Sequence, residues 1–159
     1  DVNEDTYDDT SAVSMISDTL AAMDGLSMEE IRGYIWIVVD NKAIPFTLKD
    51  RMGVPFIDGN GRSLVPFRKL LEAVGAEVGF NANGDGKIIS VDASLNGTHI
   101  ILNIGSNRYS VNGEDLTMDT AAVIKDGRTY IPARPVLEAF GYDVSYSEAG
   151  KSVYAVSNR

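Results

Sequence analysis

The stretch that decides the fold is GRSLVPFRKLLEAVGAEV at residues 61–78, because it returns as GRTYIPARPVLEAFGYDV at residues 127–144. The two runs align without a gap at a constant offset, as Arg62 and Arg128 show (128 − 62 = 66). A repeat of this length indicates two copies of one supersecondary unit. The repeat therefore predicts an architecture first, and it leaves the chemistry open.

Each copy contains start and stop signals for one short helix. Pro66 and Pro132 suit the first helical position, where the missing N–H of proline costs nothing. Gly75 and Gly141 fit the left-handed position that ends a helix. We therefore expect helices at residues 66–74 and 132–140.

Runs rich in β-branched and aromatic residues lie on both sides of each helix and predict strands. In the first copy these runs cover residues 34–39, 43–48, 77–80 and 87–91, and in the second copy residues 100–104, 108–111, 143–146 and 151–156. A short helix cannot bury its apolar face alone, so a sheet must cover it. We expect an α+β protein with two homologous small antiparallel sheets, each cradling one short helix.

The expected domains are a first repeat at residues 34–94 and a second at 95–159, after an acidic leader and helical extension at 1–33. In that extension, apolar residues recur at helical spacing within residues 13–23, and Ser27 with Glu30 fits a capping box. We expect a helix within residues 13–32 that packs on the first sheet or joins two subunits in a homo-oligomer.

Composition excludes several classes of function. The formal net charge is −9 and the lysines and arginines are scattered, which argues against nucleic-acid binding. The chain has no cysteine and one histidine, His99, so thiolate chemistry, a multi-histidine metal site and most catalytic triads are hard to build. No apolar run approaches the ~20 residues that span a bilayer. We expect no enzyme, no cofactor and no membrane span.

The repeated motif resembles the copper amine oxidase N-terminal-like, or stalk, domain, here in two tandem copies. The similarity rests on Val111-Asn112-Gly113, on residues 127–134 and 138–146, and on Lys151-Ser152-Val153, with the first copy matching at 61–68, 72–80 and 87–89. The chain departs from the family pattern at Pro135, which we expect to weaken its helix, and at Phe80 and Tyr146, where the family has tryptophan. The resemblance implies a non-catalytic module that is secreted or displayed on the surface of a Gram-positive-type bacterium.

The repeat also duplicates charged residues. Arg68 with Glu72, and Arg134 with Glu138, are pairs spaced to meet on one helix face. A ligand-binding arginine is one interpretation. We favour another, in which Arg62, Arg68, Arg128 and Arg134 are buried and tie helix to strand through backbone carbonyls or glutamate. An arginine one turn away would also keep each glutamate ionised rather than proton-donating.

Two further patterns point to ligands. Asn81, Asn83, Asp85 and Asp92 echo the spacing of a calcium loop, but the expected position between strands favours a hairpin turn, so we predict no metal site. Aromatic residues on the strands could form a sugar-stacking platform, and Tyr142, which follows a helix stop, is the one we expect to be exposed.

The function that the sequence favours is a non-catalytic structural or adhesive module that contacts surface proteins or a cell-wall polymer. The alternative is a cell-wall or carbohydrate-binding module that uses exposed aromatic residues.

Overall fold

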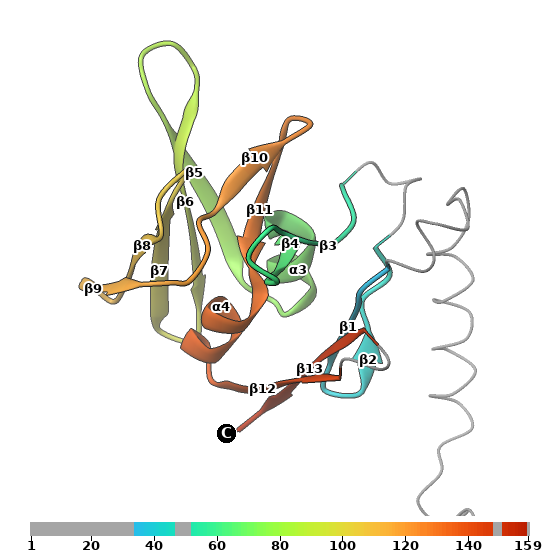
Figure 1. Cartoon of the computed structure of the whole chain (residues 1–159). Helices are drawn as coiled ribbons and strands as arrows, with labels where there is room; N and C mark the ends of the chain where they lie inside the picture. The colour runs from blue at the N-terminus through green and yellow to red at the C-terminus, as the bar shows by residue number, and fades with distance from the viewer. Residues whose placement is uncertain (1–33, 47–51, 148–150, 159) are drawn as a thin grey trace, which may run out of the picture.

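A computed structural model of the chain describes residues 34–46, 52–147 and 151–158 (Figure 1). The expectations for the leader at 1–33, including its helix and its role in an oligomer, lie outside these residues. The described residues are mainly strand, with two short helices, which is an α+β architecture.

Strands and helices follow the order expected from the repeat. The first half contains β1 (Trp36–Val39), β2 (Lys42–Ala43), β3 (Phe56–Ile57), β4 (Ser63–Pro66), α3 (Phe67–Ala73), β5 (Glu77–Ala82) and β6 (Ile88–Leu95). The second half contains β7 (Thr98–Asn103), β8 (Arg108–Val111), β9 (Glu114–Thr117), β10 (Val123–Lys125), β11 (Arg128–Pro132), α4 (Ala133–Ala139), β12 (Tyr142–Ser147) and β13 (Ser152–Ser157).

These strands form three sheets, and each sheet contains strands of both repeats. The central sheet has the order β10-β11-β4-β3, the mixed sheet β12-β13-β1-β2, and the five-stranded sheet β5-β6-β7-β8-β9. The expectation of two sheets, one for each repeat, is therefore wrong. A repeat shows which units are alike, but each sheet here is joined by one pair of strands from different copies, namely β4–β11, β1–β13 and β6–β7. The expected boundary between residues 94 and 95 falls at the end of β6, inside the five-stranded sheet.

The two repeats meet about a local two-fold axis in the central sheet. There β4 and β11 pair antiparallel, with Val65 opposite Ile131 and with Leu64 opposite Pro132. Val65 and Ile131 are also equivalent in the repeat, since 131 − 65 = 66. Within the central sheet, a half-turn about the point between them therefore exchanges β4 with β11, and it also exchanges the outer strands β3 and β10.

One hydrophobic core joins the sheets. The buried residues of α3 (Phe67, Leu70 and Leu71) and of α4 (Ala133, Val136 and Leu137) belong to the same cluster of buried side chains. The predicted helices are confirmed, although each is one residue shorter at either end. Neither of the two described helices is long and apolar enough to cross a membrane.

The helix ends show why the boundaries fall there. Pro66 and Pro132 are extended and precede the helices rather than beginning them. Gly75 and Gly141 have φ of 88° and 91°, which confirms the expected left-handed stops. Pro135 is the third residue of α4 and lies in its first turn, where an N–H has no helical acceptor, so it leaves the helix hydrogen bonds intact.

The two outer sheets differ in one strand direction. β6 and β7 are joined by the turn Asn96-Gly97, with both residues at positive φ, and must therefore run antiparallel. β1 and β13 come from distant parts of the chain and pair in parallel. No short turn constrains that pair.

Candidate functional site

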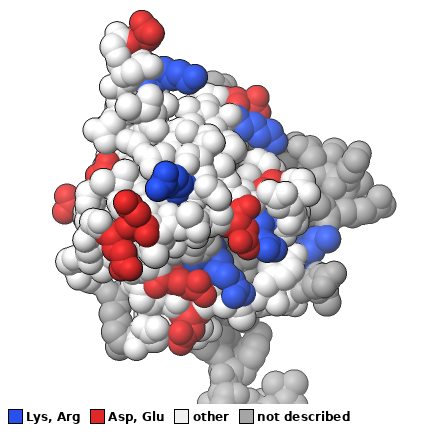
Figure 2. All heavy atoms as spheres, turned by 60° about the vertical axis from the view of Figure 1, so that its left-hand side comes forward, with Lys and Arg blue, Asp and Glu red and all other residues white. Residues whose placement is uncertain are grey.

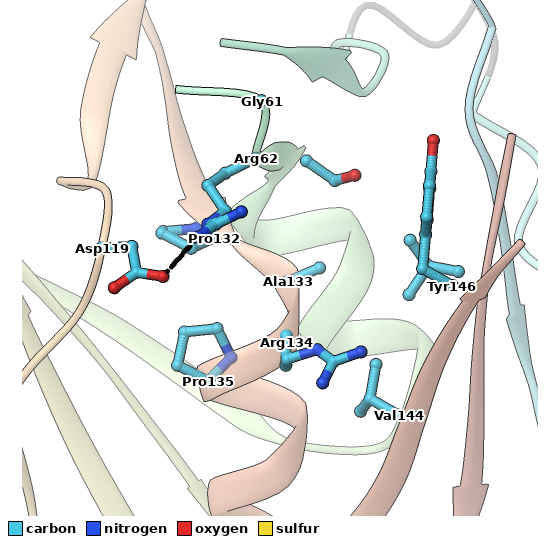
Figure 3. Close-up of a pocket in the computed structure, with 11 residues that line it drawn as sticks. Gly61, Arg62, Asp119, Pro132, Ala133, Arg134, Pro135, Val144 and Tyr146 are labelled. Carbon is cyan, nitrogen blue, oxygen red and sulfur yellow. Dashed lines mark hydrogen bonds and ion pairs between the residues drawn. The ribbon is translucent and has the colours of Figure 1, made fainter. Parts of the chain in front are cut away.

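Two surface grooves lie at opposite ends of the β4–β11 pair. Because the strands are antiparallel, the start of β4 lies beside the end of β11, from which α4 begins. The first groove forms at this corner and has a volume of about 370 Å³ (Figure 3). Its lining comes from the turn before β4, the connection between β9 and β10, the end of β11 with the start of α4, and the facing strands of the mixed sheet: Gly61, Arg62, Ser63, Asp119, Pro132, Ala133, Arg134, Pro135, Val144, Tyr146 and Val153.

The second groove forms at the other end of the pair, where β11 begins and β4 ends. It has a volume of about 290 Å³ and is lined by Met52, Phe67, Arg68, Gly79, Phe80, Ile88, Val91, Gly127, Arg128 and Thr129. The repeat offset maps Arg62 onto Arg128, Arg134 onto Arg68 and Tyr146 onto Phe80. The local two-fold axis therefore produces two related sites. In each, one copy provides the residues at the start of a central strand, and the other copy provides the start of the helix and the outer strands.

The arginines of the repeat are exposed rather than buried. The side chains of Arg62, Arg68 and Arg134 are 53%, 54% and 55% exposed. The expectation of buried guanidinium groups that tie helix to strand is wrong for these three. Arg68 and Arg134 lie where a strand becomes a helix, Arg62 lies in the turn before β4, and all three line a groove.

The expected pairs on the helices are confirmed. Arg68 Nη1 lies 3.2 Å from Glu72 Oε2, and Arg134 Nη1 lies 4.0 Å from Glu138 Oε2. Exposed pairs of this kind contribute only a few tenths of a kcal/mol. They orient the arginines without holding them away from a ligand.

The other two arginines have local partners. Arg62 donates through Nη2 and Nε to Asp119 Oδ2, at 2.7 and 3.1 Å. Arg128 Nη1 donates to the backbone carbonyl of Asp126 at 3.1 Å. Asp119 is a groove residue that the sequence analysis missed, because it lies outside the repeated motif.

The turn before β4 is held in place by Asp58, which the sequence analysis also missed. Asp58 Oδ1 accepts hydrogen bonds from the backbone N–H groups of Asn60 and Arg62, both at 2.9 Å. Burial opposes ionisation of Asp58, but these bonds and others hold its pKa below the usual range. The signal was available, since Asp58-Gly59-Asn60-Gly61 has the composition of a turn closed by an aspartate side chain.

The aromatic residues are placed differently from the expectation. Tyr142 is only 5% exposed and packs in the core, so the prediction that it is exposed is wrong. Side chains alternate along β12, and Tyr142 lies on the inner face at the end that meets the core. Tyr146 lies on that same face at its outer end, and it is 44% exposed at the groove; its counterpart Phe80 is 57% exposed.

The candidate calcium loop is a hairpin turn between β5 and β6. Asn83 Oδ1 accepts hydrogen bonds from the backbone N–H groups of Asp85 and Lys87, both at 3.0 Å. Asn81 donates to Ser90 Oγ, and Asp92 Oδ2 lies 3.2 Å from His99 Nε2. Within residues 34–46, 52–147 and 151–158, no three His, Asp or Glu side chains are grouped to hold a metal ion.

On the face shown in Figure 2, lysines and arginines are dispersed among acidic residues and form no continuous basic surface. Each of the two grooves is nevertheless lined by two arginines, so positive charge is grouped there.

Fold and grooves together define a strand-rich module with two short helices and two arginine-lined surface grooves. The model of the copper amine oxidase N-terminal domain family matches residues 38–155, and the chain belongs to this family. A single match spans both copies of the repeat, in keeping with sheets that both copies build. No curated protein sequence matches the chain.

Proposed function

We propose that this chain is a structural module that spaces or anchors other protein parts at a bacterial surface and carries tension between them. The observation that carries the proposal is the parallel pairing of β1 with β13. Tension applied before Trp36 and after Ser157 pulls these two strands in opposite directions along their own axes. The hydrogen bonds between them are then loaded in shear, all at once rather than one after another.

The β1–β13 pair is extended and protected. Four residue pairs are in register, from Trp36 opposite Ser152 to Val39 opposite Ala155. Asp40 lengthens the contact: its N–H donates to Ala155 O at 2.8 Å and its Oδ1 accepts from Ser157 N at 2.7 Å.

The inner side of this pair is closed to water. Ile37 is fully buried and Val153 is 4% exposed, and both belong to the hydrophobic core. Water competes poorly for hydrogen bonds beside such a core, so the pair holds until the core itself opens.

Placement at a surface is supported by the family resemblance and by the acidic composition, which suits a solvated extracellular module. A second candidate function, binding of a cell-wall carbohydrate, is favoured by the exposed rings of Tyr146 and Phe80.

Single-molecule force spectroscopy tests the load-bearing role. In one arrangement the handles are attached to the two ends of the chain, which loads β1 and β13 in shear. In the other, one handle stays at the C-terminal end of the chain and the second is attached through Lys42→Cys, just after β1. Both handles then pull from the same end of the β1–β13 pair and peel it open. The chain has no other cysteine and Lys42 is exposed, so the attachment is unique.

We expect the end-to-end arrangement to unfold at a force several times that of the peeling arrangement, with equal stability of both proteins toward urea. Equal forces in the two arrangements would contradict a load-bearing β1–β13 pair.

A further inference from the structure

We propose that each groove binds a carboxylate-bearing sugar ring of an acidic polysaccharide, so that one chain holds two such units. This binding activity does not depend on the load-bearing role, and either can fail without the other.

Charge complementarity is the first argument. The chain has a formal net charge of −9, yet each groove presents two guanidinium groups, Arg62 with Arg134 and Arg68 with Arg128. Among the described residues, Arg108 is the one arginine that lines neither groove. Guanidinium groups match the geometry of a carboxylate and bind it through two parallel hydrogen bonds.

The exposed aromatic ring is the second argument. In the first groove, Tyr146 stands on one wall and Asp119 on the other, and Arg62 and Arg134 project between them (Figure 3). Val144 and Val153 add apolar side chains to the lining, and Val153 lies opposite Tyr146 in the adjacent strand. An aromatic face beside hydrogen-bonding groups suits a sugar ring, whose C–H face stacks while its polar edge is bound.

The duplication of this arrangement is the third argument. Phe80 and Val91 in the second groove repeat the pairing of Tyr146 and Val153, since each aromatic residue lies opposite its valine in adjacent strands. Core packing alone does not require an exposed ring at both places, because Phe80 is 57% exposed and Tyr146 is 44% exposed.

Other anionic ligands fit less well. An extended peptide needs a free strand edge, whereas Val144, Tyr146 and Val153 line the first groove with the face of the mixed sheet. A phosphate polymer would use the arginines and leave the aromatic ring uncovered. The phosphate polymer is an outcome of the test below.

The two grooves differ in an acidic residue, and this predicts unequal affinities. Asp119 neutralises Arg62 in the first groove. Among the described residues, no acidic side chain lines the second groove. The second groove therefore binds an acidic sugar more tightly than the first.

Isothermal titration calorimetry with a short oligogalacturonate tests the proposal on the full chain at low salt. The methyl ester of the same oligomer keeps the rings without the charge, and a short polyphosphate keeps charge without rings. We expect two binding events per chain with oligogalacturonate and much weaker binding of both other probes.

Variants assign each event to a groove. Arg68→Gln weakens the tighter event, and Arg134→Gln the weaker one, each by roughly tenfold because a charged hydrogen bond is lost. Asp119→Asn strengthens the weaker event, by roughly two- to fivefold for an exposed charge pair. Arg108→Gln is the matched control and changes neither event. Urea unfolding verifies that every variant is folded.

Replacement of the rings, Tyr146→Ala and Phe80→Ala, separates sugar binding from simple anion binding. We expect each to weaken its own groove by roughly five- to tenfold. The proposal is overturned if oligogalacturonate shows no saturable binding, if its methyl ester binds equally well, or if polyphosphate binds as tightly and the ring variants change nothing.

Discussion

The strongest energetic prediction concerns Val65 and Ile131, the middle pair of β4 and β11. Both side chains are fully buried, lie opposite each other and belong to different repeats. Ile131→Ala removes three carbons from the core and leaves a cavity, at a cost of about 3 kcal/mol in the free energy of unfolding. Val65→Ala removes two carbons and costs about 2 kcal/mol.

Urea unfolding followed by two probes measures this effect. Trp36 is the single tryptophan and reports on the mixed sheet, whereas far-ultraviolet circular dichroism reports on all strands. Because each sheet is built from both repeats, we expect either substitution to shift one common transition seen by both probes.

A double-mutant cycle completes the test. The two side chains face each other across the strand pair, so the double variant should deviate from additivity by about 0.5 kcal/mol or more. Two separate transitions, of which each substitution moves only one, would mean instead that the repeats fold independently.

Three further predictions follow from single residues. Gly75→Ala should lower the free energy of unfolding in urea by about 1 kcal/mol, because φ is 88° at this position. The control Gly84→Ala, at an exposed position with ordinary φ and open space for a Cβ, should change little. Equal effects of the two substitutions would contradict the role of Gly75 as the helix stop. Burial raises the pKa of Tyr130 above its usual value of about 10, so the stability that this residue contributes is complete below pH ~10 and is lost as the pH rises through the folded-state pKa. Tyr130→Phe should therefore flatten the alkaline loss of stability, and an unchanged pH profile would speak against it. Asp40→Ala should lower the end-to-end unfolding force, because it removes the side-chain hydrogen bond to the backbone N–H of Ser157. It should leave the peeling force almost unchanged. An equal drop in both forces would argue that the substitution acts only through general stability.

Local structure was predictable from local signals. Proline and glycine mark the two helices to within one residue, because their effects on the backbone do not depend on distant contacts. The pairing of β4 with β11 was not predictable in this way. A repeat says that two strands are alike, and it contains no information on whether they pair within or between copies.

Exposure was the other property that the sequence predicted poorly. Tyr142 and Tyr146 lie on the same face of β12, and only the position of the core distinguishes the buried residue from the exposed one. Strand alternation links the two residues, but the core contains side chains from both repeats. The grooves depend on that same assembly, so Arg62 and Arg134 meet only in the folded chain.

The most direct test of the interlocked fold is to produce residues 34–94 and 95–159 as separate chains and to record a proton–nitrogen correlation spectrum of each, alone and mixed. Each fragment lacks the partner strands that complete its sheets: β4 loses β11, β6 loses β7, and β1 loses β13. We expect narrow, unfolded amide spectra for the separate fragments. A well-dispersed spectrum from either fragment alone would contradict the interlocked fold.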